Sequence, residues 1–564
     1  MKLLVLTFVL LSFCPVGGQE RYAVIIQEIM ADPSPAVGLP SSEWIEIRNR
    51  SKETVNLQGW RIADRSSQSG PLPTYHLQPD SILVVCASGS LNSLLPFGPT
   101  IAVTSFPSLD NDGDLLSLFT ASGSTMHAVD YDLTWYANDL KKEGGWSLEL
   151  IDQDNPCTGK NNWMASRFAA GGTPGDVNSV NGTMPDDEPP VLLRAYTIND
   201  RAVRLVFDET VDSLKASLVT SYNNSDVRPG EAFPIAPMFN EVELRLPAAM
   251  QAGLTYTVAM DAPCDCAGNA AAESRVMVGV PALLTKGTLV INEILFNPVP
   301  SGYDYVELIN AGDSVVDLAR GFLASRNSTG SVAGHVALSA TPRLLFPGEF
   351  FVLTDDPNRL QLHFFSPARG QIETVASMPS FPDDKGVVLV TGMQGDILDE
   401  VPYSDKWHFP LMRQTEGVSL ERIDPLNTSG DKLNWHSASS TSGYGTPGYR
   451  NSQSVPESSA GGLMAVDPPV FSPDNNGIDD QCFIRFSLPQ AGMVARVDIF
   501  NVHGLLVKRL VQGGLLGSAG YWTWDGLNDK GQAIAPGPYI ILVSLFDLGG
   551  HSRKYKMVVI LASG

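Results

Sequence analysis

Carboxylates at recurring positions are the first residues of this sequence that could do chemistry. Glu28 and Glu46 stand in two short apolar runs, and the same pattern returns around Glu293 and Glu307. Paired carboxylates can serve as general acid and base when they share a site. No histidine or nucleophile accompanies these glutamates in the sequence, and a catalytic constellation needs such partners. We therefore favour solvated or capped strand positions over a catalytic pair.

Two acidic loops carry the residue types that bind Ca²⁺. Hard cations take several oxygen ligands on a tightly turning loop, and Asp or Asn at alternate positions around a Gly supplies both. Neither loop has the Glu that closes an EF-hand, and the same residues build ordinary turns. We expect plain turns and no cofactor, with Ca²⁺ as the alternative. The weak Ca²⁺ candidates are Asp110, Asp112 and Asp114 in the first loop, and Asp474, Asn476, Asp479 and Asp480 in the second.

The remaining polar residues form no recognised catalytic motif. The eight histidines are scattered, with no pair three or four residues apart, which helical zinc motifs require. The sequence also lacks the Gly-x-Ser-x-Gly elbow and the phosphate-binding Gly-x-x-x-x-Gly-Lys-(Ser/Thr) loop. Triads can assemble from distant residues, so an enzyme is not excluded. Because no catalytic residue can be nominated, we predict a protein that is not an enzyme.

The N-terminal residues predict export. One lysine precedes about eleven mostly apolar residues that end at Phe13, as in a secretory signal peptide. The small residues Val16 and Gly18 place cleavage after Gly18, so residues 1–18 form the expected signal. A lipoprotein attached at Cys14 is the rival, although Phe13 fills a position that normally holds a small residue. Later apolar runs are shorter than the ~18 residues that a bilayer requires, so we expect no transmembrane segment.

Five cysteines follow the expected signal: Cys86, Cys157, Cys264, Cys266 and Cys482. In an oxidising compartment an odd number leaves at least one thiol unpaired. Cys264 and Cys266 are too close together for most metal sites. A disulfide from one of them to Cys157 is one interpretation, and buried free thiols are the other.

Composition limits the classes of protein that these residues can belong to. The chain has 564 residues, which suggests about three to five domains. Hydrophobic residues make up 43% and charged residues 18%, with 51 Gly and 40 Pro. This turn-rich globular composition excludes wholesale disorder and coiled coil. The net charge of −23 repels phosphate backbones, so we expect no nucleic-acid partner.

The elements that position these residues occur twice. Seven motifs recur in the same order, which indicates one domain present in two copies. They include residues 24–38 matched by 289–302, Gly145–Glu149 matched by Gly417–Glu421, and Gly172–Gly175 matched by Gly445–Gly448.

The repeated motifs resemble the lamin-tail domain. The resemblance rests on the Ile-Asn-Glu-Ile-x-x-(Asn/Asp)-Pro entry, the following Glu-containing strand and the closing Gly-Thr-Pro-Gly, over residues 22–180 and 287–452. The second copy departs from the family at Asp317–Phe322, where the first has the Gly-Trp step of Asn56–Trp60. In its bacterial form this domain decorates secreted proteins, and the resemblance implies an immunoglobulin-like β-sandwich. Short runs of Val, Ile, Leu, Tyr and Phe between Gly, Pro, Asn and Asp clusters independently favour such a fold.

Two further segments have their own resemblances. Alternating apolar residues around Val203–Phe207 predict strands, and Asp208–Val211 with the turn at Ala267–Asn269 resembles a bacterial Ig-like domain. Phe471–Asp480 and the later Gly-Pro-Tyr strand resemble the Ig-like module named for the flagellar hook-capping protein. They also resemble the C-terminal domains that Bacteroidetes-type bacteria use as type IX secretion signals. Asp474 here replaces the usual Asn, a modest departure that leaves the sorting role open.

The sequence therefore predicts an all-β chain of four tandem immunoglobulin-like β-sandwiches after a signal peptide. The expected parts are a signal peptide (1–18), a first lamin-tail domain (19–182), a bacterial Ig-like domain (188–281), a second lamin-tail domain (287–452), a flexible linker (453–466) and a C-terminal Ig-like or sorting-like domain (467–564).

The expected function is a non-catalytic secreted or cell-surface role in adhesion, scaffolding or spacing. The C-terminal domain would contact the export machinery, and the other partner would be an extracellular protein or glycan. Two alternatives stay open, an accessory or cryptic form of a secreted hydrolase and a structural component of an envelope or matrix. Fold analogy alone does not choose between them.

Overall fold

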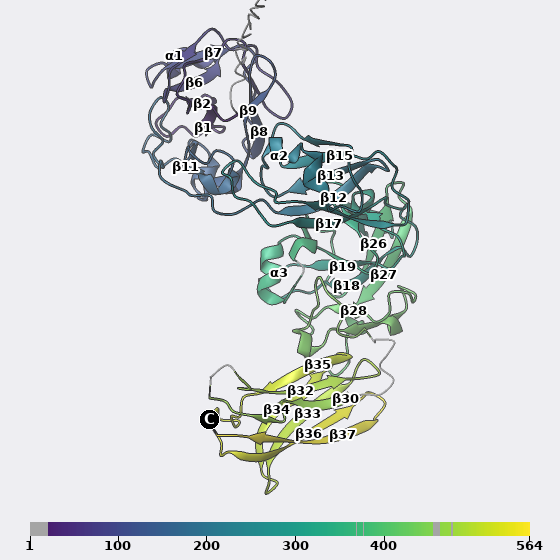
Figure 1. Cartoon of the computed structure of the whole chain (residues 1–564). Helices are drawn as coiled ribbons and strands as arrows, with labels where there is room; N and C mark the ends of the chain where they lie inside the picture. Colours follow the sequence, from purple (N-terminus) through teal and green to yellow (C-terminus); the bar gives the residue numbers. More distant parts are fainter. Residues whose placement is uncertain (1–20, 368, 376, 455–462, 475–477, 564) are drawn as a thin grey trace, which may run out of the picture. The chain divides into compact units, whose positions relative to one another are not determined.

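A computed structural model describes residues 21–563 except residues 368, 376, 455–462 and 475–477. The predicted signal peptide at 1–18 lies outside the described residues. The chain forms two compact units, Met1–Ala249 with Tyr256–Met277, and Met250–Thr255 with Val278–Gly564. Strands dominate both units, as the all-β prediction requires, and the described α-helices are short (Figure 1). No helix in the described part of the chain is long and apolar enough to cross a membrane.

In the first unit, the first repeat copy builds a six-stranded sheet in the order β11-β10-β1-β2-β6-β7. It shares an apolar core with the sheet β4-β8-β9. The bounds are β1 (Val24–Met30), β2 (Trp44–Asn49), β3 (Val55–Asn56), β4 (Arg61–Ala63), β5 (His76–Leu77), β6 (Ile82–Ala87), α1 (Leu91–Leu94), β7 (Thr100–Val103), β8 (Gly113–Phe119), β9 (Thr125–Asp132), β10 (Leu148–Leu150) and β11 (Trp163–Ala165).

The following segment forms a four-stranded sheet in the order β12-β13-β15-β14 and a separate two-stranded sheet β16-β17. The alternating Val203, Leu205 and Phe207 are buried, as the period of a half-buried strand predicts. The bounds are β12 (Leu192–Asn199), β13 (Ala202–Phe207), α2 (Ser213–Ala216), β14 (Glu231–Pro234), β15 (Glu241–Arg245), β16 (Thr255–Met260) and β17 (Ser274–Gly279).

In the second unit, the second repeat copy has the sheet order β29-β28-β18-β19-β24-β25, which matches the first copy strand for strand. Even the parallel pairing at one edge is shared, β6 with β7 and β24 with β25. The bounds are β18 (Leu289–Leu295), β19 (Tyr305–Asn310), β20 (Val316–Asp317), β21 (Gly321–Arg326), β22 (Val332–Ala337), β23 (Leu344–Leu345), β24 (Phe350–Thr354), α3 (Pro357–His363), β25 (Ile372–Thr374), β26 (Lys385–Gly392), β27 (Ile397–Ser404), β28 (Leu420–Arg422) and β29 (Trp435–Ser437). The repeat seen in the sequence is therefore a repeat of topology.

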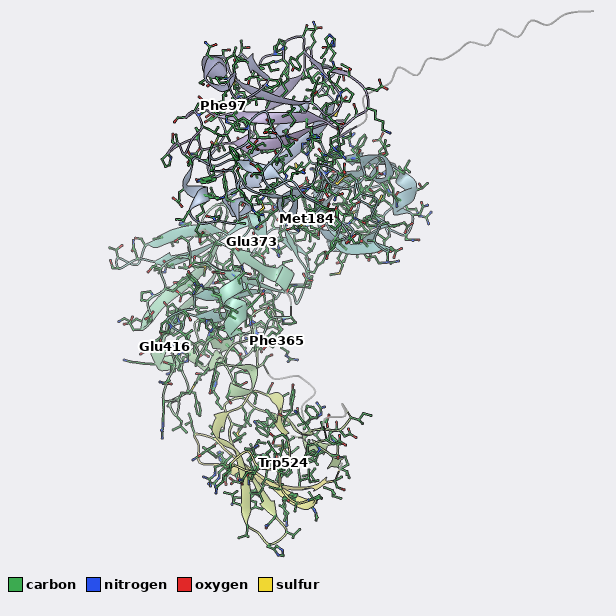
Figure 2. All side chains as sticks on the ribbon, turned by 90° about the vertical axis from the view of Figure 1, so that its left-hand side faces the viewer. Phe97, Met184, Phe365, Glu373, Glu416 and Trp524 are labelled. Atoms are coloured by element: carbon green, nitrogen blue, oxygen red, sulfur yellow. A yellow bond between two sulfur atoms is a disulfide. The ribbon has the colours of Figure 1, made fainter. Side chains whose placement is uncertain are left out.

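The C-terminal segment packs the sheets β30-β32-β35 and β31-β37-β36-β33-β34 around one core. Trp524, labelled in Figure 2, is fully buried there and donates its indole N–H to the carbonyl of Leu527. The bounds are β30 (Leu463–Asp467), β31 (Val470–Phe471), β32 (Cys482–Ser487), β33 (Val494–Asn501), β34 (Leu506–Leu515), β35 (Ala519–Trp524), β36 (Gly537–Phe546) and β37 (Ser552–Leu561).

The predicted flexible linker at 453–466 includes residues at both ends that are buried or paired in a strand. Gln453 is fully buried, and residues 463–466 belong to strand β30. Residues 455–462 lie outside the described part of the chain. The Ser- and Gly-rich composition therefore misplaced the linker's ends, because backbone pairing and burial order residues that composition alone assigns to a loop.

Candidate functional site

Three neighbouring strands of each repeat copy each contribute one glutamate to the same face of the sheet. The central glutamate lies directly opposite the other two in the strand register. We call each set a glutamate latch. The first latch is Glu28, Glu46 and Glu149, and the second is Glu293, Glu307 and Glu421.

Of the two interpretations given for Glu28, Glu46, Glu293 and Glu307, solvated or capped, the solvated one is wrong, and each of these carboxyl groups accepts a backbone N–H group. All six are 0% exposed. The cause is the closing segment of each copy, residues 171–180 and 444–453, whose backbone and hydroxyl groups bond to these carboxyl groups on the face of the sheet that would otherwise meet water. Sequence reasoning had already paired Glu28 with Glu293 and Glu46 with Glu307. It overlooked Glu149 and Glu421 as members, although both stand in the repeated Ser-Leu-Glu motif.

In the first copy, each glutamate of the latch accepts a hydrogen bond from a different backbone N–H group of the closing segment. The N–H of Thr173 donates to Glu28 Oε1 at 2.8 Å, and the N–H of Gly175 donates to Glu46. The N–H of Val180 donates to Glu149 Oε2 at 3.1 Å. Each carboxyl group thus satisfies a buried donor that has no strand partner, which is the condition for burying this backbone without penalty.

The second copy repeats the arrangement donor for donor. Thr446 N–H donates to Glu293 Oε1 at 2.9 Å, and Gly448 N–H donates to Glu307 Oε2 at 2.6 Å. Gln453 N–H donates to Glu421 Oε2 at 2.8 Å. The Gly-Thr-Pro-Gly motif is therefore the part of the chain that the glutamates hold.

A bulge in the central strand aims the neighbouring amide at the latch. The register of β1 shifts between Ile26 and Glu28, and that of β18 shifts at the equivalent place. The extra residue in the first copy is Gln27, whose side-chain N–H donates to Glu46 Oε1 at 2.6 Å. Asn292 donates to Glu307 in the same way at 2.7 Å. Bulges re-aim side chains locally, and here they supply one more donor to a buried carboxyl group.

Each latch geometry holds at least one proton. Thr173 Oγ1 lies 3.2 Å from Glu28 Oε2 and 3.1 Å from Glu149 Oε1. A hydroxyl group has one hydrogen to donate, so both contacts are hydrogen bonds when Glu28, whose pKa burial holds well above its usual value, is protonated and donates to the hydroxyl. Thr446 Oγ1 lies 3.0 Å from both Glu293 Oε2 and Glu421 Oε1, which gives the second latch the same requirement.

The surroundings of the latch glutamates favour the protonated form of their carboxyl groups. Burial raises the pKa of Glu46 to about 8, despite the hydrogen bonds that favour its ionised form. Burial and the neighbouring Glu293 raise the pKa of Glu421 to about 8. Burial and the two flanking carboxyl groups hold the pKa of Glu28 well above its usual value. Like charges this close cannot all ionise, so each latch stays partly neutral at ordinary pH.

The latches can bind the closing segments and retain a proton. A substrate cannot reach their carboxyl groups. Their six carboxyl groups lie beneath the closing segments, and their acceptor positions are filled by the backbone and hydroxyl donors named above. We conclude that the most chemistry-like pattern in the sequence is structural.

A second cluster of carboxyl groups lies in the first unit. Three carboxyl oxygens, one from each of Asp186, Glu209 and Asp265, lie within 4.8 Å of one another. They lie beside a cavity of about 730 Å³. Burial and the neighbouring acidic groups raise the pKa of Glu209 to about 8. These are oxygen ligands of the kind that Ca²⁺ takes, although Asp265 already accepts three hydrogen bonds from Gly268 and Asn269. The residues are far apart in sequence, so no local motif could have indicated the cluster.

The first predicted Ca²⁺ loop is a turn leading into β8. Asp114 is 2% exposed, and it accepts the backbone N–H groups of Arg65 and Leu115 at 3.3 and 2.8 Å. Asp110 and Asp112 are exposed. The structure thus brings one of the three carboxylates into the protein and leaves two at the surface. The loop is a turn, as expected, and Ca²⁺ binding stays the untested alternative.

The second predicted Ca²⁺ loop is described only in part, since Asn476 lies outside the described residues. Asp474 and Asp479 flank that gap. The carbonyl group of Asp479 accepts the N–H of Ser472 at 2.9 Å, and the backbone of Asp479 is left-handed, with φ of 53°. Asp480 follows just before β32. Ca²⁺ binding here also stays a prediction.

A disulfide joins Cys157 to Cys266 across 109 positions of the sequence. From the sequence, a disulfide from Cys157 to one of the two close cysteines was one interpretation and buried free thiols were the other. Cys86, Cys264 and Cys482 have free thiols, and Cys86 and Cys482 are buried. Within the first unit, the bond ties the first repeat copy to the segment that carries β16 and β17.

A family model described as Lamin Tail Domain matches residues 19–132. The match covers β1 to β9 of the first repeat copy and agrees with the resemblance found in the sequence. No curated protein matches the chain.

Several solved bacterial structures are similar to parts of the chain. The N-terminal part of the bacterial S-layer protein SbsC is 15% identical over 28% of this chain and 44% of that one, with a TM-score of 0.16. PorZ, a surface component of the type IX secretion system of Porphyromonas gingivalis, is 10% identical over 80% and 56%, with a TM-score of 0.17. A Ca²⁺-stabilised ice-binding adhesin of an Antarctic bacterium is 10% identical over 97% and 100%, with a TM-score of 0.12.

The chain spans less than half the length of the SbsC fragment and little more than half that of PorZ. At these identities and TM-scores the likenesses support no inference about the function or the domain arrangement of this chain.

Proposed function

We propose that the protein is an exported, non-catalytic scaffold of tandem β-sandwiches, located at the cell surface or secreted. The observation that carries the proposal is that neighbouring sandwiches within each unit are fastened to each other by covalent or well-packed contacts. A protein that spaces or presents binding surfaces needs such stiffness, whereas flexibly linked domains move independently by default.

In the first unit, the fastening is covalent and polar. The Cys157–Cys266 disulfide is the covalent part. Asn155 and Asn269 donate side-chain N–H groups to the carbonyl groups of Met184 and Asp186, at 2.6 and 2.8 Å. These bonds fix the acidic, proline-rich segment of residues 184–190 that joins the first repeat copy to β12. The disulfide also supports export, because structural disulfides persist in oxidising compartments.

In the second unit, the fastening is a packed contact between the second repeat copy and the C-terminal sandwich. Phe409 is 5% exposed and packs with Val494 and Leu515. The side-chain N–H group of Gln453 donates to the carbonyl groups of Ser437 and Leu516. One buried amide therefore bonds to both sandwiches at once.

The latches support the absence of catalysis, because the repeated carboxylates are committed to holding the closing segments. A role of residues 467–564 in export or attachment rests on the sequence resemblance to type IX sorting domains. In this proposal the C-terminal sandwich contacts the export machinery, and the other sandwiches present surfaces to an extracellular protein or glycan.

Trapping thiols in cells that express the full chain tests the export half of the proposal. Acid quenching followed by N-ethylmaleimide should modify three cysteines of residues 19–564 before reduction and five after it. The Cys264→Ser variant is the matched control and should give two and then four. Five modified thiols before reduction would show that the chain stays in a reducing compartment and would overturn the proposal.

Protease added to intact cells tests the surface half. The full chain should be degraded while a cytoplasmic marker survives, and lysed cells provide the positive control. Protection of the chain in intact cells, together with the expected thiol pattern, would place it inside the envelope and contradict a surface role.

A further inference from the structure

Two histidines adjoin the phenylalanine that joins the second repeat copy to the C-terminal sandwich. His408 directly precedes Phe409 in the chain and is 5% exposed. His436 stands in β29 and is half-buried, and its ring lies against that of Phe409 with ring centres 5.4 Å apart. Phe409 in turn packs with Val494 and Leu515 of the C-terminal sandwich. The protonation state of the two imidazoles therefore affects the surroundings of this contact.

The surroundings of His408 suit its neutral form better than its charged form. Its Nδ1 lies 3.0 Å from Ser437 Oγ, which also accepts the backbone N–H of Phe409 at 2.9 Å. Its Nε2 is buried and has no hydrogen-bond partner among the described residues. A protonated imidazole carries a hydrogen on both nitrogens, so protonation places a charge and a second N–H where no acceptor stands. Burial of such a group is costly.

His436 faces the C-terminal sandwich with the nitrogen that takes up a proton. Its Nδ1 lies 3.1 Å from the carbonyl oxygen of Ser437. Because a carbonyl group can only accept, Nδ1 carries the hydrogen of the neutral ring and Nε2 is the free base. That Nε2 lies 2.9 Å from the point where a Cβ on Gly492 of the C-terminal sandwich would stand. Protonation therefore adds a hydrogen and a charge directly against the other sandwich.

The ionisable groups around the two rings do not compensate for this burial. Burial lowers the pKa of His408 to about 4, although the charge of Asp405 acts to raise it, and the neighbouring His436 lowers it further. Burial also lowers the pKa of His436, against its hydrogen bond to the Ser437 carbonyl group. Glu421 lies directly opposite His436 in the strand register. Its own pKa of about 8 keeps it mostly neutral where a histidine titrates.

We propose that the contact between the second repeat copy and the C-terminal sandwich is sensitive to pH and opens when His408 and His436 are protonated. Protonation of His408 weakens the site that anchors the backbone of Phe409 on Ser437, and protonation of His436 charges the surface against Gly492. In the open form both rings reach water, so this form takes up the protons that the closed form excludes. The inference adds a condition to the junction of the proposed scaffold and does not depend on where the chain is located.

The size of the effect follows from the pKa of His408 in the two forms. It is about 4 in the closed form, and that of a histidine in water is about 6.5. The contact is therefore fully stable above the second value and weakens as the pH falls toward the first. Between pH 7 and pH 5, this difference raises the ratio of open to closed molecules about twentyfold. His436 acts in the same direction, because burial lowers its pKa as well.

Hydrogen exchange of the purified full chain at pH 7 and pH 5 tests this inference. Two amides report on the junction, because Gly492 donates its N–H to Gln453 Oε1 at 3.3 Å and Ser518 donates its N–H to the carbonyl group of Ser452 at 2.7 Å. After correction for the intrinsic exchange rate at each pH, the protection of these two amides should fall about twentyfold. The amides that pair β33 with β36 inside the C-terminal sandwich should keep their protection.

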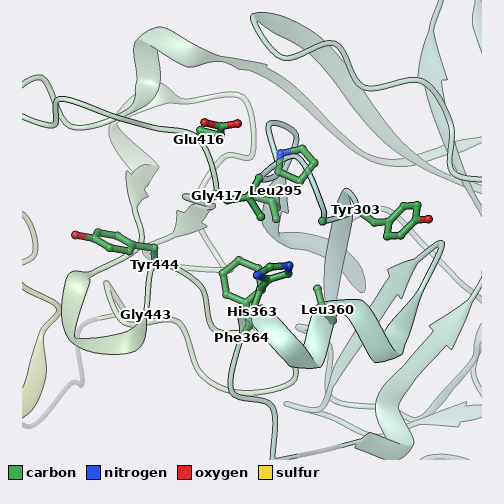
Figure 3. A pocket seen from close by; sticks show the side chains of 12 residues that line it. Leu295, Tyr303, Leu360, His363, Phe364, Glu416, Gly417, Gly443 and Tyr444 are labelled. Carbon is green, nitrogen blue, oxygen red and sulfur yellow. The ribbon is translucent and has the colours of Figure 1, made fainter.

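Variants of the chain identify the histidines. The double variant His408→Asn with His436→Asn keeps an amide near each Nδ1 position but takes up no proton in this range. The protection of Gly492 and Ser518 should then change less than about twofold between pH 7 and pH 5. His363→Asn is the matched control, because His363 is an exposed histidine of the same repeat copy that lines a cavity of about 210 Å³ (Figure 3). It should behave as the unmodified chain.

Three outcomes would overturn the inference. The first is constant protection of Gly492 and Ser518 down to pH 5 in the unmodified chain, a result that does not require the double variant to fold. The second is an equal loss of protection between β33 and β36, because this would indicate acid unfolding of the whole sandwich. The third is a double variant that loses as much protection as the unmodified chain. None of these outcomes changes the thiol-trapping result, so failure of this inference is distinguishable from failure of the proposed function.

Discussion

The second glutamate latch makes the stability of its repeat copy fall as the pH rises. Burial raises the pKa of Glu421 to about 8 in the folded protein. The pKa of a glutamate in an unfolded chain is about 4.3. Between these values the folded state holds a proton that the unfolded chain has released. The stabilisation is therefore complete below the unfolded pKa and is lost as the pH rises through the folded one. Carboxylates whose pKa is lowered by pairing in the folded protein have the opposite effect, because they make the protein less stable as the pH falls.

The magnitude is worked for one proton, the one that Glu421 holds beside Thr446 Oγ1 in the folded protein. Each proton held only in the folded state changes the free energy of unfolding by about 1.4 kcal/mol per pH unit. Because the titration levels off near the folded pKa of about 8, the loss between pH 6 and pH 8 is about 2 kcal/mol.

The substitution Glu421→Gln should remove the share of this pH dependence that Glu421 carries, while burial still raises the pKa of Glu293 and of Glu307. The amide oxygen can accept from Gln453 N–H, and the amide N–H can donate to Thr446 Oγ1 in place of the carboxylic proton. The variant should match the unmodified chain at pH 6 and exceed it by about 2 kcal/mol at pH 8. The assay is urea unfolding of the full chain, with the transition of residues 440–454 read by hydrogen-exchange pulses at one fixed pH.

Glu400→Gln is the matched control. The hydrogen bond to Arg326 lowers the pKa of Glu400, so this glutamate does not titrate between pH 6 and 8. Its substitution should cost at most about 1 kcal/mol, as for a surface ion pair, equally at both pH values. The reasoning is refuted if Glu421→Gln and the unmodified chain lose the same stability between pH 6 and pH 8.

Three further predictions test the disulfide, the closing segment and the junction in the second unit. Cys266→Ser frees Cys157 and should lower the stability of the first unit by up to about 5 kcal/mol in non-reducing urea unfolding; an unchanged midpoint would contradict it. Gly448→Ala places a side chain at φ of 85°, and should cost more than about 1 kcal/mol and speed exchange of the N–H that Glu307 accepts. Phe409→Ala empties a contact that is 5% exposed and should cost about 3 kcal/mol; an unchanged thermal unfolding temperature would show that the contact is not formed.

The architecture of the repeat could be predicted from the sequence, because each strand of the sheet carries its own local pattern and the patterns recur in order. The role of Glu28 could not. A glutamate in an apolar strand faces water unless another segment covers it, and the covering Thr173 lies 145 positions later in the chain. The motif containing Thr173 was visible, but its contact with a glutamate is a tertiary fact that no local spacing encodes.

The cysteines show the same boundary between local and distant information. Spacing argued against a metal site at Cys264 and Cys266 and left a disulfide to Cys157 as one of two interpretations. The choice of Cys266 depends on which thiol faces Cys157 after folding. The acidic cluster of Asp186, Glu209 and Asp265 was invisible for that reason as well. Residues joined by local turns were predictable, and residues joined by packing were not.

The two repeat copies separate what this fold requires from what it leaves free. Both keep three buried glutamates, a threonine that shares a proton between two of them, and glycine where a backbone N–H must approach a carboxyl group, with φ of 82° at Gly175 and 85° at Gly448. A charged residue buried this deeply is costly unless its partners are complete, so a substitution is tolerated only where the new side chain keeps the hydrogen bonds, as glutamine does in Glu421→Gln. The connection after the first strand holds none of the latch glutamates, so its length is not constrained in this way. That connection is thirteen residues long in copy one and nine in copy two, and both copies keep the latch, so its length is free where the glutamates and their partners are not.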